Sequence, residues 1–248
     1  MGGDPNPESC LLAIESVVRG GADMLEIGVP FSDPMADGKS IQAAGVRALL
    51  AGTRPANVLE IAHQAKEAHD VPVILMTYFN PIYSTGIDRF LDSARRARVD
   101  GLIVPDLPLE EAEAFGKSVR RRGIDSILLA APTTGSERMK KVVTNTSGFL
   151  YLVSVLGVTG ARLGLRPETM RLVKFARRFT ADRIPLAVGF GISKPEHIGA
   201  VVEAGADAAI VGSAIVDRVA CLSEEGERAF HDIETYVRSM KRATIRTG

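Results

Sequence analysis

Short apolar runs alternate with amphipathic stretches along the whole chain. One unit recurs four times: an amphipathic stretch ends at Gly or Arg, an Asp follows within a few residues, and a short apolar run comes next. A helix that stops there and leads into a buried strand has this pattern. The four copies end at Gly28, Asp106, Pro132 and Ser213. They predict four helix-to-strand units.

Three more apolar runs predict strands at Val73–Thr77, Phe149–Ser154 and Leu186–Gly189. These runs are nearly continuous, as in strands of parallel sheets that are buried on both faces. Amphipathic patterns predict helices at Glu8–Arg19, Ala56–Ala68, Ile87–Arg96, Glu110–Arg121, Ser136–Asn145, Pro167–Phe179, Pro195–Glu203 and Glu224–Lys241. The alternation predicts a parallel α/β fold. No linker or shift in composition divides it, so we expect one domain over residues 1–248.

The positions of the glycine-rich turns favour a closed barrel over an open sheet. No G-x-G-x-x-G follows a strand, as a dinucleotide fold would require. Glycine turns instead follow the last two strands, at Gly189–Ser193 and Val211–Val216, where (β/α) barrels frequently bind phosphate. We therefore predict a TIM (β/α)8 barrel.

Seven strands can be recognised, so the first strand of the barrel is expected to be missing from this chain. Residues 2–8, GGDPNPE, then correspond to the loop that follows it. Its absence would leave Met24–Gly28 and Ala208–Val211 each with an unpaired edge.

The amino-acid composition indicates which classes of binding partner and which cell compartment to expect. The 248 residues include 30 basic and 30 acidic side chains, so the formal charge is zero and predicts no nucleic-acid or anionic membrane partner. Cys10 and Cys221 form no metal-ligand pattern, as in a reducing compartment. No signal peptide or membrane span is recognisable, and a cytoplasmic location is expected.

Two carboxylates are candidates for acid–base chemistry. Glu26 lies in the apolar run MLEIG, where an unpaired carboxylate is costly. A structural ion pair is the alternative explanation. Asp37 follows that strand in PFSDPMADG, at the end where barrel enzymes carry their active sites, although Asp-Gly is also a common turn. Asp33 in the same loop is expected to be a turn residue.

The sequence offers no candidate residues for Schiff-base or metal-dependent catalysis. None of the eight lysines falls on a predicted strand, where a Schiff-base lysine would be expected. The four histidines lie in or beside predicted helices without ligand spacing, so we expect each on a helix surface. Acid–base work by carboxylates remains.

Two further segments have open interpretations. Residues 148–162, GFLYLVSVLGVTGAR, combine a strand with a loop that could be a flap or a plain connection. Tyr151 could point into the barrel with its hydroxyl or fill the core. The PDLP turn around Asp106 is expected to be structural.

The run LEIGVPFSDPMADG, at Leu25–Gly38, resembles the signature of the tryptophan synthase alpha chain family. PDLP, GVTGAR, GFGIS and VGSAIV recur in the same order as in that family, and the likeness spans the chain from Gly3 onward. The resemblance implies a lyase of tryptophan biosynthesis that cleaves indole-3-glycerol phosphate into indole and glyceraldehyde 3-phosphate. It also implies a β subunit partner in an α2β2 complex, with pyridoxal phosphate only in that partner and no cofactor in this chain.

By the same resemblance, Glu26 is the catalytic glutamate that protonates indole C3 and then accepts the side-chain hydroxyl proton. Asp37 is the catalytic aspartate that hydrogen-bonds the indole N–H. The other matched positions bind substrate: Met76 and Tyr151 line the indole pocket, Thr159 belongs to the flap, and the phosphate is held by Gly160, Gly191, Gly212 and Ser213.

Two rival hypotheses stay open at this point. Another phosphate-binding barrel of tryptophan or histidine biosynthesis would be favoured by a strand lysine or by paired strand-end aspartates, and neither is seen. A non-catalytic or weakly active barrel that only regulates a β partner is favoured by the missing strand, whereas retention of Glu26 and Asp37 argues against it.

Overall fold

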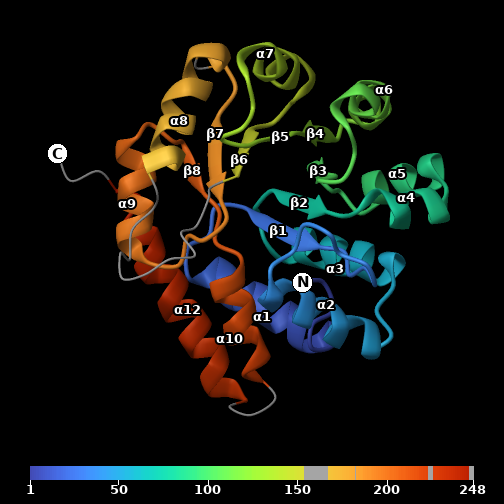
Figure 1. Cartoon of the computed structure of the whole chain (residues 1–248). Coiled ribbons are helices and arrows are strands. Elements are labelled where there is room, and N and C mark those ends of the chain that lie inside the picture. Colours follow the sequence, from blue (N-terminus) through green and yellow to red (C-terminus); the bar gives the residue numbers. More distant parts are fainter. Residues whose placement is uncertain (154–166, 182, 223–225, 246–248) are drawn as a thin grey trace. The chain divides into compact units, whose positions relative to one another are not determined.

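A computed structural model describes residues 1–153, 167–181, 183–222 and 226–245 (Figure 1). Internal contacts divide the chain into two compact units. Unit 1 comprises Met1–Ser126 and Ile215–Arg238, and unit 2 comprises Ile127–Ala214 and Ser239–Gly248. Each unit is described by itself. Among the described residues, no helix has both the length and the apolar character that a membrane crossing requires.

The first sheet has the strand order β1-β2-β3-β4, and β2 pairs in parallel with both β1 and β3. Its strands are β1 (Leu25–Gly28), β2 (Val73–Met76), β3 (Gly101–Ile103) and β4 (Asp125–Ile127). The helices of this part are α1 (Pro7–Arg19), α2 (Lys39–Leu50), α3 (Pro55–Ala68), α4 (Phe79–Thr85), α5 (Ile87–Arg96) and α6 (Leu109–Arg120). Two later helices contribute residues to unit 1, α10 (Ser213–Ala220) and α12 (Glu227–Arg242).

Side-chain alternation gives the first sheet two different faces. Leu25 and Ile27 of β1 join a buried cluster with residues of α1, α3 and α5, and Figure 1 shows these helices beside the strands. Successive side chains of a strand point to opposite faces. Glu26 therefore projects from the face that the helices do not cover, in register with Ile74 of β2.

The second sheet has the order β5-β6-β7-β8, with parallel pairing throughout. Its strands are β5 (Leu129–Ala130), β6 (Leu150–Val153), β7 (Leu186–Gly189) and β8 (Ala208–Ala209). The accompanying helices are α7 (Ser136–Asn145), α8 (Pro167–Thr180) and α9 (Pro195–Glu203). Backbone N–H of Ile210 donates to Val188 O at 2.7 Å, so the chain leaves β8 beside the end of β7.

The aspartate of the repeated sequence unit has the same structural role in both units. Asp100, just before β3, accepts a 2.7 Å hydrogen bond from the backbone N of Val73, the first residue of β2, and a 2.8 Å bond from Lys66 Nζ. Asp207, just before β8, accepts 2.7 Å bonds from the backbone N of Leu186, the first residue of β7, and from Arg177. Each carboxylate thus fixes the start of the neighbouring strand.

The prediction of a parallel α/β fold is confirmed, and the predicted helices agree with the described ones to within a few residues. The predicted strand that ends at Pro132 is interrupted at Leu128, which gives β4 and β5. Helix α2 was not predicted because it buries only small residues, Ala44, Gly45 and Ala48. Helix α4 was not predicted because it contains Pro81, which a helix tolerates in its first turn. The single-domain prediction stays a prediction.

The described residues 1–24 contain no strand ahead of β1. Instead, the backbone N–H of Gly2 donates to Gly28 O, the last carbonyl of β1, at 2.8 Å. β1 and β8 are edge strands within their own sheets. The missing strand and the unpaired edges that it would leave stay predictions.

Candidate active site

Glu26 lies in the middle of β1 and is the acid with the most perturbed environment. Leu25 and Ile27 are about 5% exposed, whereas the side chain of Glu26 keeps an open face. Burial nevertheless raises the pKa of its carboxyl from 4.5 to about 7, against a smaller opposing effect of the Met1 α-ammonium group. Both observations fit a carboxyl that is accessible to a small molecule but surrounded by enough protein to displace bulk water. Such a group can donate and accept a proton near neutral pH.

Asp37 lies in the loop between β1 and α2 and is partly buried. Burial raises the pKa of its carboxyl, while a hydrogen bond from Tyr78 and the Met1 α-ammonium group lower it. The backbone oxygen of Asp37 accepts a 2.9 Å bond from Gln42 Nε2, which ties the loop to the first turn of α2. Because the same ammonium group influences both carboxyls, Glu26 and Asp37 share one electrostatic environment within unit 1.

Tyr78 positions the Asp37 loop, although no role was predicted for it from the sequence. The residue follows β2 and is 5% exposed. Its hydroxyl accepts a 2.9 Å bond from the backbone N of Ala36 and interacts with the Asp37 carboxyl, while its ring packs against Phe31 at 5.5 Å. Burial raises the pKa of this hydroxyl, so it remains a neutral donor. One feature of the sequence could have indicated this role: Tyr78 comes just after a predicted strand, where side chains at the carboxyl end of a barrel can reach the active site.

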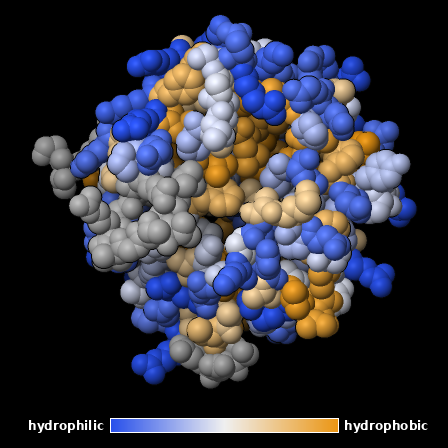
Figure 2. All heavy atoms as spheres, viewed as in Figure 1, coloured by the Kyte–Doolittle hydropathy of each residue, from blue (hydrophilic) through white to orange (hydrophobic). Residues whose placement is uncertain are grey.

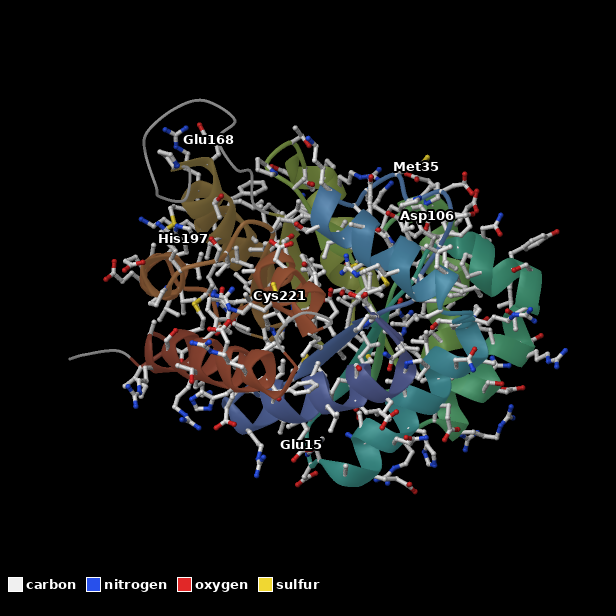
Figure 3. The ribbon with its side chains drawn as sticks, turned by 90° about the horizontal axis from the view of Figure 1, so that it is seen from below. Glu15, Met35, Asp106, Glu168, His197 and Cys221 are labelled. Carbon is white, nitrogen blue, oxygen red and sulfur yellow. The ribbon has the colours of Figure 1, made fainter. Side chains whose placement is uncertain are left out.

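Asp106 of the PDLP turn caps a helix. Its two carboxylate oxygens accept bonds of 2.9 and 3.1 Å from the backbone N of Phe79, the first residue of α4. Negative charge at a helix start is stabilising. Asp106 also acts electrostatically on Tyr78, and Figure 3 shows it on the same side of unit 1 as Met35 of the Asp37 loop. The expected structural role of PDLP agrees with this contact.

Tyr151 of β6 packs within unit 2 against the turn that follows β7. It is 3% exposed, and its ring meets Phe190 edge-on at 5.9 Å between centroids. A Cβ atom on Gly189 would lie 2.2 Å from the Tyr151 hydroxyl oxygen. Position 189 must therefore be glycine if Tyr151 is to keep this place. Sequence reasoning singled out Tyr151 and missed its dependence on Gly189.

The glycine turns of unit 2 contain left-handed backbone and a helix start, two features that can bind an anion. Phe190 and Gly191 have φ of +71° and +73°, and left-handed residues in a turn can orient N–H groups towards one ligand. A non-glycine residue in this conformation is strained, which is commonest at functional sites. Gly212 and Ser213 are exposed where α10 begins, so Ser213 is in the first turn of that helix. A helix start of this kind favours an anion.

Comparison with known proteins decides the family. The model of the tryptophan synthase alpha chain family matches residues 1–245. The chain belongs to the tryptophan synthase alpha chain family. A tryptophan synthase alpha chain from Methanoregula boonei is 45% identical over 243 residues, which cover 98% of this chain and 91% of that relative. One from Prochlorococcus marinus strain MIT 9313 is 49% identical over 220 residues, which cover 89% and 79%.

Solved structures agree with this assignment. A tryptophan synthase complex from Pyrococcus furiosus is similar with a TM-score of 0.86 and 36% identity, over 97% of this chain and 95% of that one. A chain of the a2b2 complex from the same organism gives 0.88 and 39%, over 97% and 94%. The TIM barrel fold class and the predicted lyase reaction of tryptophan biosynthesis are confirmed for this member of the family.

The predicted site residues have different outcomes. In unit 1, Glu26 lies in the middle of β1, Asp37 lies in the loop between β1 and α2, and Met76 ends β2. Tyr151, Gly191, Gly212 and Ser213 belong to unit 2. Their roles stay predictions. Thr159 and Gly160, with the rest of the predicted flap, lie outside the described residues.

The predictions for the lysines and histidines can also be compared with the structure. No strand in the described ranges contains a lysine, and no group of three or more potential metal ligands is found in the same ranges. The expectation that every histidine is on a helix surface is wrong for His197, which is 7% exposed and accepts a bond from the backbone N of Ser193. That bond fixes the glycine turn to α9.

Proposed function

We propose that Glu26 and Asp37 perform the lyase reaction of this family, in which indole-3-glycerol phosphate gives indole and glyceraldehyde 3-phosphate. The observation that carries the assignment is the pKa of about 7 of a carboxyl that keeps an accessible face on β1. A group that acts first as an acid and then as a base works best when its pKa is near the working pH.

The reaction needs two proton transfers at Glu26. The protonated carboxyl delivers its proton to indole C3, which makes the ring an iminium-like electron sink. The carboxylate then accepts the proton of the side-chain hydroxyl next to the ring. The carbon–carbon bond breaks, its electron pair returns to the ring, and the hydroxyl carbon becomes the aldehyde of glyceraldehyde 3-phosphate. Asp37 accepts a hydrogen bond from the indole N–H and balances the positive charge that develops there.

The residues that family resemblance assigns to the phosphate belong to unit 2. The backbone N–H groups of Gly191 and Gly212 and the hydroxyl of Ser213 bind the phosphate, helped by the dipole at the start of α10. Family resemblance assigns Met76 and Tyr151 to the indole ring. Thr159 and Gly160 are assigned to the flap and the phosphate site by family resemblance alone.

Both proton transfers use side chains of this chain, so the proposed mechanism requires no cofactor here. Pyridoxal phosphate is assigned to a β subunit partner, in an α2β2 complex like the one named for the Pyrococcus furiosus relative. The loop Pro30–Gly38 is proposed to face that partner. The predicted second loop, Gly157–Leu165, lies outside the described residues.

Replacement Glu26→Gln tests the assignment. We expect indole release from indole-3-glycerol phosphate, measured with and without a β subunit, to fall by about 10²–10⁴-fold while the fold is unchanged. Glu203→Gln, at an exposed glutamate at the end of α9, is the matched control and should retain full activity. Near-normal release by Glu26→Gln would overturn the assignment. A wild-type chain that releases no indole under either condition would support the non-catalytic alternative.

A further inference from the structure

Helix α2 continues directly from the loop that carries Asp37, because it begins at Lys39. Its orientation therefore helps to set where the backbone of Asp37 lies, together with the bond from Ala36 N to the Tyr78 hydroxyl. The helix buries only Ala44, Gly45 and Ala48, which remove little apolar area from water. Of its larger apolar residues, Ile41 is half-buried, whereas Val46, Leu49 and Leu50 are exposed, and Figure 2 shows this apolar surface over α2. Apolar packing alone holds the helix weakly and without a defined direction.

A directional contact is made by Arg47, near the last turn of α2. Its Nε and Nη2 atoms donate to Oδ1 and Oδ2 of Asp4 at 2.7 and 2.8 Å, across 43 residues of sequence. Asp4 is 1% exposed, so its charge is compensated by a partner and not by water. The two parallel bonds of such a pair fix both the distance and the orientation of the groups.

The segment that carries Asp4 is itself attached to β1. Gly2 N donates to Gly28 O, two residues beyond Glu26. Gly3 has φ of +77°, and a Cβ atom there would lie 2.2 Å from Thr53 Oγ1, so only glycine fits. The side chain of Met1 approaches both Gly28 and Gly45. Figure 1 shows the N-terminus beside β1 and α2.

We propose that Asp4 and Arg47 form a positioning pair that sets the place of Asp37 relative to Glu26. The chain of contacts runs from Glu26 along β1 to Gly28, then to the N-terminal segment, Asp4, Arg47, α2 and Asp37. Neither member of the pair is assigned contact with substrate. The proposal rests on the proposed function, because it requires that Asp37 acts in the reaction. Misplacement of a catalytic group by about 1 Å can cost about 10²-fold in rate.

A double-mutant cycle with Asp4→Asn and Asp37→Asn tests the pair. Asp4→Asn alone should lower kcat for indole release by about 10-fold with a smaller change in KM. In the Asp37→Asn background, the same replacement should lower kcat no further, because Asp4 acts through Asp37. Equal losses in both backgrounds, or an unchanged kcat for Asp4→Asn, would overturn the proposal.

Arg47→Lys provides a second variant should the buried Asp4→Asn fail to fold. Lysine keeps the charge but loses the two-pronged geometry, so kcat should fall by several-fold, again only when Asp37 is present. Arg122→Lys is the matched control, since Arg122 also pairs with two carboxylate groups, Asp88 and Asp92, on the surface. It should leave kcat unchanged. If Asp37→Asn alone has no effect on kcat, the proposed function fails first, and the two failures are distinguished.

Discussion

Acids that come just before a strand and the two acids of β1 and its following loop have opposite environments. At the amino ends, Asp100 and Asp207 each accept a backbone N–H of the neighbouring strand and a cation, Lys66 or Arg177. Glu26, in the middle of β1, and Asp37, in the loop that follows the carboxyl end of β1, are held in surroundings that raise their pKa values, mainly by burial. Neither makes an ion pair with a lysine or arginine among the described residues.

The difference separates acids that support stability from acids that are suited to function. A carboxylate with a cation and an N–H donor is satisfied in its charged form and supports the fold. Burial without a lysine or arginine partner disfavours the charged form of a carboxyl. Such a carboxyl lowers the stability of the fold, but its raised pKa is suited to proton transfer. Barrel enzymes divide their two ends in this way, with catalysis at the carboxyl ends of the strands.

The largest expected effect concerns activity at the carboxyl ends. Asp37→Asn keeps the size of the side chain but removes the charge that balances the indole N–H, so indole release should fall by about 10²–10³-fold. The free energy of unfolding should stay the same or increase. Steady-state kinetics and urea unfolding measure the two quantities. Asp33→Asn in the same loop is the control, and equal losses in both variants would show that the loop, not the Asp37 charge, is responsible.

An intermediate effect is expected for stability at the amino ends. Asp207→Ala leaves the backbone N–H of Leu186 and the guanidinium of Arg177 without this acceptor, so unfolding should become easier by about 1–3 kcal/mol. Activity per folded molecule should persist. Asp70→Ala is the matched control, because Asp70 also precedes a strand but makes no hydrogen bond or ion pair within the described ranges. Urea unfolding that cannot distinguish the two variants would contradict the comparison.

The smallest effect is the pH dependence that Glu26 adds to stability. Its pKa is 4.5 when exposed to solvent and about 7 in the folded chain. The stabilising contribution is therefore complete below pH 4.5 and is lost as the pH rises through 7. The full shift corresponds to about 3 kcal/mol, and solvent at the open face of the side chain reduces the expected loss to about 1 kcal/mol.

Urea unfolding of wild type and Glu26→Gln at pH 5 and pH 8 measures this contribution. The variant should gain stability relative to wild type at the higher pH. A difference between the two proteins that does not change with pH would show that the Glu26 carboxyl titrates normally.

The sequence by itself determined the order of the strands and of most helices, because apolar periodicity and helix stops are local properties. It did not predict α2, α4 and α10. It also identified Glu26, since a carboxylate inside an apolar strand is visible without a structure. The glycine turns after the last two strands were visible for the same reason, and the first signature was specific enough to indicate the family. The repeated aspartate could be recognised as a pattern, but its bonds to Val73 and Leu186 could not.

Only the tertiary structure decided which distant residues support the candidate site. Tyr78 meets the Asp37 loop, Arg47 reaches Asp4, and Tyr151 lies over Gly189, and each contact joins segments far apart in sequence. Such contacts depend on strand register and on how a helix packs, and neither is encoded in local propensity. Helix α2 is the clearest case. Its buried face consists of small residues, so the sequence shows no strong apolar periodicity there, and the ion pair between Arg47 and Asp4, 43 residues apart, holds the helix in place.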